Sequence, residues 1–260
     1  DGGGAVDTTR VYKYSRMDGQ SIAVFFYNGP LARAIAFEQA LRSSTTLVDG
    51  FIRLGRTGDL VNVATDGETY GHHFKFGDLC LAHALEIEAN EAGFWITNYA
   101  EYLDHHVPEI EVKLNLGPLN EGTSWSCAHG VSRWTRDCGC HTGGQAGWNQ
   151  RWREPLRSAL NVLRDNSIKH FENRGADLFV APWSARNDYV KVLLHPGSWP
   201  EFLAKHKKRV LSPAEEVSAR TLLEIQRYAL LMYTSCGWFF SDIGGIETVQ
   251  VMRYAARLIE

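Results

Sequence analysis

Three short apolar runs alternate with helix-forming stretches in the N-terminal part of the chain, and this order constrains the fold more than any other feature. The runs lie at residues 21–27, 60–65 and 94–97. Residues 31–43 contain no helix breaker, and apolar side chains recur at helical spacing over residues 76–91. An alternation of strands and helices is typical of a parallel sheet with crossover helices. The sequence therefore predicts an α/β fold for this part.

The pattern changes beyond Trp148, where strand patterns end and helix formers are dense. Ser212 precedes Pro213, which favours a helix start with Ser at the cap and Pro in the first position. We predict helical stretches at residues 149–172, 182–194, 199–206 and 213–233. The expected organisation is a partial (β/α) barrel with parallel strands at residues 1–116, a loop-rich segment at 117–148 and an all-helical domain at 149–260.

The composition is that of a globular protein, with 44% hydrophobic and 22% charged residues. The formal net charge is -3 and the basic residues are scattered, so we expect no nucleic-acid partner. No apolar stretch approaches the roughly 20 residues that span a bilayer, so we expect no membrane partner. The five cysteines are odd in number and unevenly spaced, which favours free thiols in a reducing, cytoplasmic compartment.

A dense run of ionisable residues follows the second apolar run. It reads Asp66-Gly67-Glu68-Thr69-Tyr70-Gly71-His72-His73. Loops at the carboxyl ends of parallel strands form the active face of α/β enzymes. Asp66 could instead cap a helix beside two surface histidines, but two acids and two imidazoles within eight residues favour a functional site. By spacing alone, these four side chains could equally bind a metal ion.

The stretch ATDGETYGHHFKFGD, at residues 64–78, resembles the motif of the family-57 glycoside hydrolases that contains the acid/base aspartate. The resemblance implies a retaining mechanism on α-glucans with Asp66 as the general acid/base. Glu68 and His72 would be neighbours that tune or orient it, and His73 would contact the substrate.

The second catalytic carboxylate is not found in the sequence. The family's glutamate nucleophile lies in a motif on an earlier barrel strand, and Glu38, Glu101 and Glu121 lack that context. Because the chain opens on Asp1-Gly2-Gly3-Gly4 without Met, we expect an excised segment whose partner is an upstream barrel half. Retaining chemistry needs two carboxyl groups about 5–5.5 Å apart, so the isolated chain is expected to be a poor hydrolase.

Two further runs resemble the uncharacterised domain that accompanies the family-57 module in some proteins. They are SWSCAHGVSRWTRDCGC at residues 124–140 and TSCGWFFSDIGGIETVQ at residues 234–250. The resemblance thus covers nearly the whole chain and implies a glucan-active enzyme.

Cysteines and histidines are concentrated between the two predicted domains. Thiolates and imidazoles suit zinc, but the pairs here have Cys-x-His and Cys-x-Cys spacing instead of the usual C-x2-C. We assign no metal ion and no cofactor, and favour a reduced, packed cysteine cluster or a redox-labile pair. The residues concerned are Cys127, His129, Cys138, Cys140 and His141.

Aromatic residues accompany these cysteines and follow Gly237. Tryptophan can stack on the apolar face of a sugar, although it is more often partly buried core. We assign an oligo- or polysaccharide as the substrate partner. The predicted substrate-binding residues are His73, Trp125, His129, Trp134, Trp238 and Phe239.

Two other classes of function stay open at this point. The missing nucleophile and the many aromatic residues would also suit a non-catalytic carbohydrate-binding module. A metal-dependent hydrolase could be built on His72, His73 and the cysteine-rich run.

Overall fold

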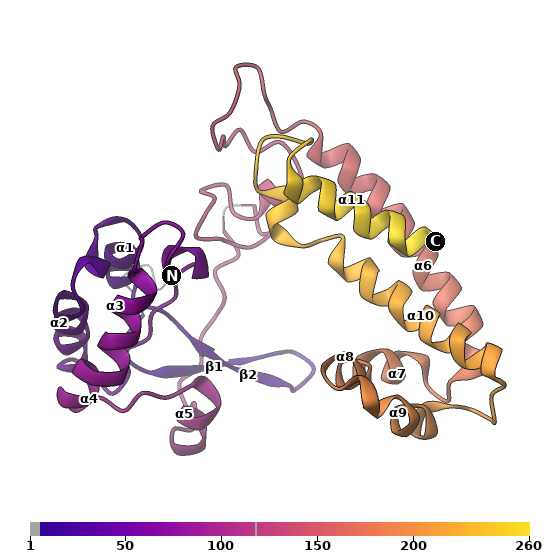
Figure 1. Cartoon of the computed structure of the whole chain (residues 1–260), viewed down its shortest axis with the longest axis horizontal. Helices are drawn as coiled ribbons and strands as arrows, with labels where there is room; N and C mark the ends of the chain where they lie inside the picture. The colour runs from indigo at the N-terminus through magenta and orange to yellow at the C-terminus, as the bar shows by residue number, and fades with distance from the viewer. Residues whose placement is uncertain (1–5, 118) are drawn as a thin grey trace. The chain divides into compact units, whose positions relative to one another are not determined.

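The computed structural model describes residues 6–117 and 119–260, and it divides into two compact units (Figure 1). The first unit is Asp1–Asn115 and the second is Leu116–Glu260. None of the helices in the described part of the chain is long and apolar enough to cross a bilayer.

An antiparallel hairpin begins the described part of the first unit. Strand β1 (Val11–Ser15) pairs with β2 (Ser21–Phe25) in a register that joins Val11 to Phe25 and Ser15 to Ser21. Gly19 has a φ of 81° in the connecting turn, which a residue with a Cβ rarely adopts. Strand β2 confirms a strand within residues 21–27, but this strand is only partly buried and pairs antiparallel instead of parallel.

The helices of the first unit surround one apolar core. Asn28 starts the first helix by accepting a hydrogen bond from the N–H of Leu31 at 2.9 Å, and Leu47 and Ala84 are fully buried within the core. The predicted helix at 31–43 is interrupted because Gln39 adopts a left-handed conformation. The elements are α1 (Gly29–Phe37), η1 (Ala40–Arg42), α2 (Ser44–Gly55), η2 (Gly67–Thr69), α3 (Gly77–His83), the π-helical η3 (Ala84–Glu88), α4 (Ala89–Glu91) and α5 (Tyr99–His105).

The predicted parallel sheet and partial barrel are not formed by the residues that the structure describes. Residues 60–65 and 94–97 have no strand ladder, although both were predicted as strands. The first of these segments holds isolated hydrogen bonds instead, from Leu60 N–H to the Thr9 carbonyl at 3.1 Å and from Asn28 N–H to the Asn62 carbonyl at 2.8 Å. An apolar run indicates burial, whereas a strand also needs a neighbouring strand to pair with. Composition does not specify that neighbour.

The second unit is helical over the stretches that the sequence predicted as helices. Its long helices are α6 (Arg153–Leu178), α10 (Pro213–Leu231) and α11 (Ile246–Ile259), and α10 packs against both of the others (Figure 1). Shorter elements are η4 (Ser132–Trp134), α7 (Pro182–Asp188), α8 (Val190–Leu194), η5 (Pro196–Ser198), α9 (Trp199–His206) and η6 (Ser235–Trp238).

Two apolar clusters stabilise these helices. One surrounds Phe171 and Phe179 and includes residues of α7, α8 and α9. The other surrounds Trp238, Met232 and Val251 and joins α6, α10 and α11. The second cluster lies under the loop-rich segment, because Trp134 and Trp152 pack against it. This contact positions the cysteine-rich run on the helical scaffold.

Candidate functional site

The loop that begins at Asp66 presents its ionisable side chains to solvent. Asp66 precedes the short helix η2, and its carbonyl accepts a hydrogen bond from the N–H of Thr69 at 3.1 Å. Nε2 of His73 lies 3.8 Å from a carboxylate oxygen of Glu68, and the His72 and His73 rings are 5.0 Å apart. Asp66 and His72 are also exposed. The structure thus brings Glu68, His72 and His73 together beside an accessible Asp66.

A cavity of about 640 Å³ lies next to this loop within the first unit. Residues 59–63 and 93–99 line much of it, so the two segments that were predicted as strands form its walls. Tyr70 also lines the cavity, and its hydroxyl is 2.7 Å from that of Thr65, the residue before Asp66. Asp66 itself is not among the residues that line this cavity.

The cavity has aromatic walls and a few polar groups. Asn62 is almost fully buried, and its side-chain oxygen accepts a hydrogen bond from the Tyr99 hydroxyl at 2.8 Å. Trp95, Tyr102 and His106 add aromatic surface. Sequence reasoning missed Asn62 and Trp95 because it treated residues 60–65 and 94–97 as paired strands. The Asn inside an apolar run, at position 62, was the available signal.

Three glutamates were considered as second carboxylates, and each has its own partners. Glu38 pairs with Arg33 at 2.9 Å, and Glu101 accepts a hydrogen bond from the Thr97 hydroxyl at 2.8 Å. Glu121 pairs with Arg136 in the second unit. Among the described residues, no carboxylate forms a hydrogen bond with Asp66.

The predicted aromatic substrate contacts all lie in the second unit and differ in accessibility. Trp125 is exposed, whereas Trp134 is half-buried and donates a hydrogen bond from Nε1 to the Ser235 carbonyl at 3.2 Å. Trp238 is fully buried and stacks with Trp152 and Tyr233, so its ring packs the core and is closed to a ligand.

Phe239 is the remaining aromatic candidate. The guanidinium of Arg133 lies 4.3 Å from the centre of the Phe239 ring, and the Phe240 ring is 5.3 Å from it. The structure therefore brings the two segments that resemble the accompanying domain together, since Arg133 belongs to residues 124–140 and Phe239 to residues 234–250. His129 does not join these rings but lies among the cysteines.

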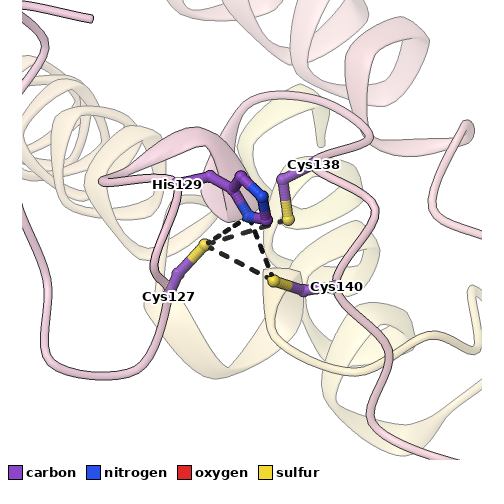
Figure 2. A group of neighbouring side chains, drawn as sticks. All are labelled: Cys127, His129, Cys138 and Cys140. Carbon is purple, nitrogen blue, oxygen red and sulfur yellow. Dashed lines mark hydrogen bonds between the residues drawn. The ribbon is translucent and has the colours of Figure 1, made fainter. Parts of the chain in front are cut away.

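Three thiols and one imidazole converge within the loop-rich segment, and Figure 2 shows their side chains pointing toward one another. We call Cys127, His129, Cys138 and Cys140 the Cys/His cluster. The Cys127 sulfur is 3.9 Å from that of Cys138 and 3.8 Å from that of Cys140. Nδ1 of His129 is 3.3 Å from the Cys140 sulfur and 3.9 Å from the Cys127 sulfur. All four atoms lie within 4.8 Å of one another.

The fifth residue of the cysteine-rich run is not in the cluster. Nδ1 of His141 accepts a hydrogen bond from the N–H of Gly143 at 2.9 Å, and its Nε2 is 3.3 Å from the Trp148 carbonyl. His141 therefore shapes the loop that follows the cysteines.

A buried polar layer supports the cluster from the helical side. Oε1 of Gln150 lies 3.6 Å from the Cys138 sulfur and accepts a hydrogen bond from Arg153 at 2.7 Å. Arg153 is fully buried and also donates to the carbonyl of Phe239 at 2.7 Å. This layer was missed in the sequence, where Arg153 reads as an ordinary solvent-facing residue at a helix start.

The Cys138 thiol is acidified relative to an ordinary cysteine. Burial opposes its ionisation, but hydrogen bonds from the Cys140 N–H and from the thiols of Cys140 and Cys127 hold the pKa of Cys138 below its usual value. Burial raises the pKa of Cys140. The cluster thus contains one thiol that ionises before its neighbour.

Comparison with known families divides the chain in a similar way. The model of glycosyl hydrolase family 57 matches residues 4–115, and that of a domain of unknown function, DUF3536, matches residues 148–260. The resemblance of residues 64–78 to family 57 and that of residues 234–250 to the accompanying domain are therefore confirmed, whereas the run at residues 124–140 lies outside both matched ranges. The Cys/His cluster lies between the two matched ranges. No curated protein and no solved structure matches the chain.

Proposed function

We propose, because residues 4–115 belong to glycosyl hydrolase family 57 and residues 148–260 to DUF3536, that this protein cleaves or transfers α-glucosidic bonds with retention of configuration. The family match is the observation that carries the proposal. It supports a glycoside hydrolase and implies a carbohydrate substrate.

Asp66 is the general acid/base in this proposal. It lies inside the matched range, its side chain is open to solvent, and the residue before it, Thr65, contacts Tyr70, which lines the cavity. In a retaining mechanism it protonates the leaving oxygen and later deprotonates water or an acceptor sugar. Glu68 and His72 orient it, and His73, which lies near Glu68, contacts the substrate.

The cavity supports carbohydrate binding through its wall chemistry. Sugars present apolar C–H faces and polar edges, so they suit a surface with aromatic rings and a few fixed hydrogen-bonding groups. Trp95 and Tyr99 supply ring surface, and Asn62 supplies a buried amide. In the second unit, the predicted contact Trp125 is exposed and Phe239 is half-buried.

The nucleophile is assigned to a family-57 strand outside these 260 residues. Retaining catalysis needs a second carboxyl about 5–5.5 Å from the first. Pairing with further barrel strands would also give residues 60–65 and 94–97 the backbone partners that a parallel barrel requires. An upstream barrel half is thus the proposed protein partner.

Asp66→Asn in the protein that contains both barrel halves tests the assignment. We expect hydrolysis of maltooligosaccharides to fall by about 10²–10⁴-fold, because the proton donor is lost. The hydrolysis rate of aryl glucosides with a good leaving group should fall less, because such a leaving group departs with little protonation. Reducing-sugar release and chromophore release measure the two substrates.

Asp49→Asn is the matched control, because Asp49 is an exposed aspartate on α2 within the same matched range. It should retain wild-type rates. Equal rates for Asp66→Asn and Asp49→Asn on maltooligosaccharides would remove Asp66 from the mechanism.

A non-catalytic glucan-binding role is the second candidate. It is favoured by the absence of the family's nucleophile motif from the sequence and by the exposed Trp125. Titration with maltooligosaccharides, followed by tryptophan fluorescence and product analysis, separates the two. Binding without product by the protein with both barrel halves would support this role.

A further inference from the structure

We propose that the Cys/His cluster binds a single structural zinc ion. The proposal departs from the sequence-based assignment of no metal. It does not depend on glycosidase activity, because metal binding is measured without any sugar.

The spacing of the ligand atoms fits one tetrahedral ion. With Zn–S bonds of about 2.3 Å, two sulfurs of a tetrahedral site lie about 3.8 Å apart. The Cys127 sulfur lies 3.8 and 3.9 Å from the other two sulfurs. A Zn–N bond of about 2.0–2.1 Å places the imidazole nitrogen about 3.6 Å from each sulfur. Nδ1 of His129 lies 3.3 Å from one sulfur and 3.9 Å from another.

The donor set favours zinc and a structural role. Three thiolates and one imidazole are a standard ligand set for structural zinc, whereas calcium and magnesium prefer oxygen ligands. The protein supplies all four ligands of a tetrahedral site, which leaves no open position for a substrate or water. A metal-dependent hydrolase built on this cluster is therefore disfavoured, and His72 and His73 belong to the other unit.

Buried positive charge beside the cluster supplies a second, independent argument. Arg153 is 0% exposed and Arg133 is 6% exposed, and neither forms a salt bridge with a carboxylate among the described residues, although Asp137 is near enough to attract Arg153 electrostatically. The Nε atoms of both arginines are buried without a hydrogen-bond partner in the described part of the chain. A buried cation is costly unless opposite charge compensates it.

Zinc with three thiolates supplies that opposite charge. The complex of one Zn²⁺, three thiolates and a neutral imidazole carries a net charge of about -1. Gln150 lies between the cluster and Arg153: its side-chain oxygen is 3.6 Å from the Cys138 sulfur and accepts a hydrogen bond from the guanidinium. This oxygen accepts from the Cys138 thiol only while Cys138 is protonated, so zinc binding would leave it with the hydrogen bond from Arg153.

The geometry disfavours the alternative of a disulfide. The Cys127 sulfur lies 3.8 Å or more from its two neighbours, far beyond a disulfide bond of about 2.05 Å. All five cysteines of the chain are free. A disulfide would also remove the negative charge that faces the buried arginines.

The proposed ion would hold a segment that has little other regular structure. Between residues 117 and 152 the described chain forms the short helix η4 and otherwise turns and loops. A metal site in such a segment replaces the core that it cannot build, as in small zinc domains. It would fix the loop that places Arg133 on Phe239.

Metal analysis of the full chain, purified under reducing conditions without chelator, tests the proposal. We expect about one zinc per chain after gel filtration. Replacement by Co²⁺ should give the visible absorption bands of a tetrahedral thiolate site. The number of thiols that react quickly with a thiol reagent should rise by three when a strong chelator is added.

Cys138→Ser should lose the zinc, whereas Cys236→Ser should keep it, because Cys236 is an exposed cysteine outside the cluster. If Cys138→Ser does not fold, the cobalt spectrum and the thiol count of the unmodified chain still test the proposal. A chain that takes up no zinc or cobalt in reducing buffer would overturn the proposal. So would cluster thiols that react equally fast with and without zinc.

Discussion

Glu215 shows how one half-buried carboxylate can make several contacts at a helix start. It pairs with Arg209 at 2.6 Å, and it also accepts hydrogen bonds from the N–H and hydroxyl of Ser212 at 2.8 and 2.9 Å. The Arg209 contact, followed by those of Ser212, lowers the pKa of Glu215 to about 2. The capping signal in the sequence was therefore sufficient to predict the start of α10.

A pH dependence follows from this carboxylate. Its pKa is lower in the folded state than the ordinary value of 4.5, so its stabilising contribution is present above about 4.5 and is lost as the pH falls towards 2. Glu215→Gln should lower the free energy of unfolding at pH 7, and the difference from wild type should shrink below pH 4.5. Urea unfolding at several pH values measures this difference in the free energy of unfolding.

Glu216→Gln is the matched control, because it removes a charge from the same helical turn without removing the capping hydrogen bonds. It should change the unfolding free energy less than Glu215→Gln at pH 7. A gap between Glu215→Gln and wild type that stays constant from pH 7 to pH 2.5 would contradict the assignment.

At the scale of elements, η6 and α11 approach too closely to admit a side chain at Gly237. A Cβ at this position would lie 2.1 Å from Cγ2 of Val251 and 3.1 Å from the Glu247 carbonyl. Gly237→Ala should therefore lower the free energy of unfolding by about 1–3 kcal/mol through overpacking. Gly197→Ala in η5 is the control, since a Cβ there meets nothing within 4 Å. Equal urea midpoints for both variants would contradict this packing.

The elements also show which signals the sequence contains. Helices in the second unit were predicted because helix propensity, periodicity and the Ser212 cap are local. The parallel strands predicted at residues 60–65 and 94–97 are not formed in the described part of the chain, because strand pairing joins distant residues that the local sequence does not specify. Residues 60–63 line a cavity instead. The Cys/His cluster was visible as composition, but its convergence depends on loop conformations that Cys-x-His and Cys-x-Cys spacing does not specify.

At the scale of the whole molecule, the Cys/His cluster is connected to a segment about a hundred residues away. The Ser241 hydroxyl is 3.1 Å from that of Thr142, and Nε1 of Trp152 donates to the Ser241 carbonyl at 3.2 Å. Arg153 adds hydrogen bonds to the Phe239 and Phe240 carbonyls. The loop-rich segment and residues 235–242 should therefore become ordered together.

This coupling predicts which regions become more flexible when the metal is removed. Chelation should speed hydrogen exchange in residues 120–152 and also in residues 235–242, because the loop that supports the second segment loses its cross-link. Exchange in α2 should stay unchanged, since α2 belongs to the core of the first unit. Hydrogen exchange with mass spectrometry on the intact chain measures all three regions. Faster exchange confined to residues 120–152 would mean that the hydrogen bonds to Ser241 and Phe239 do not depend on the ion.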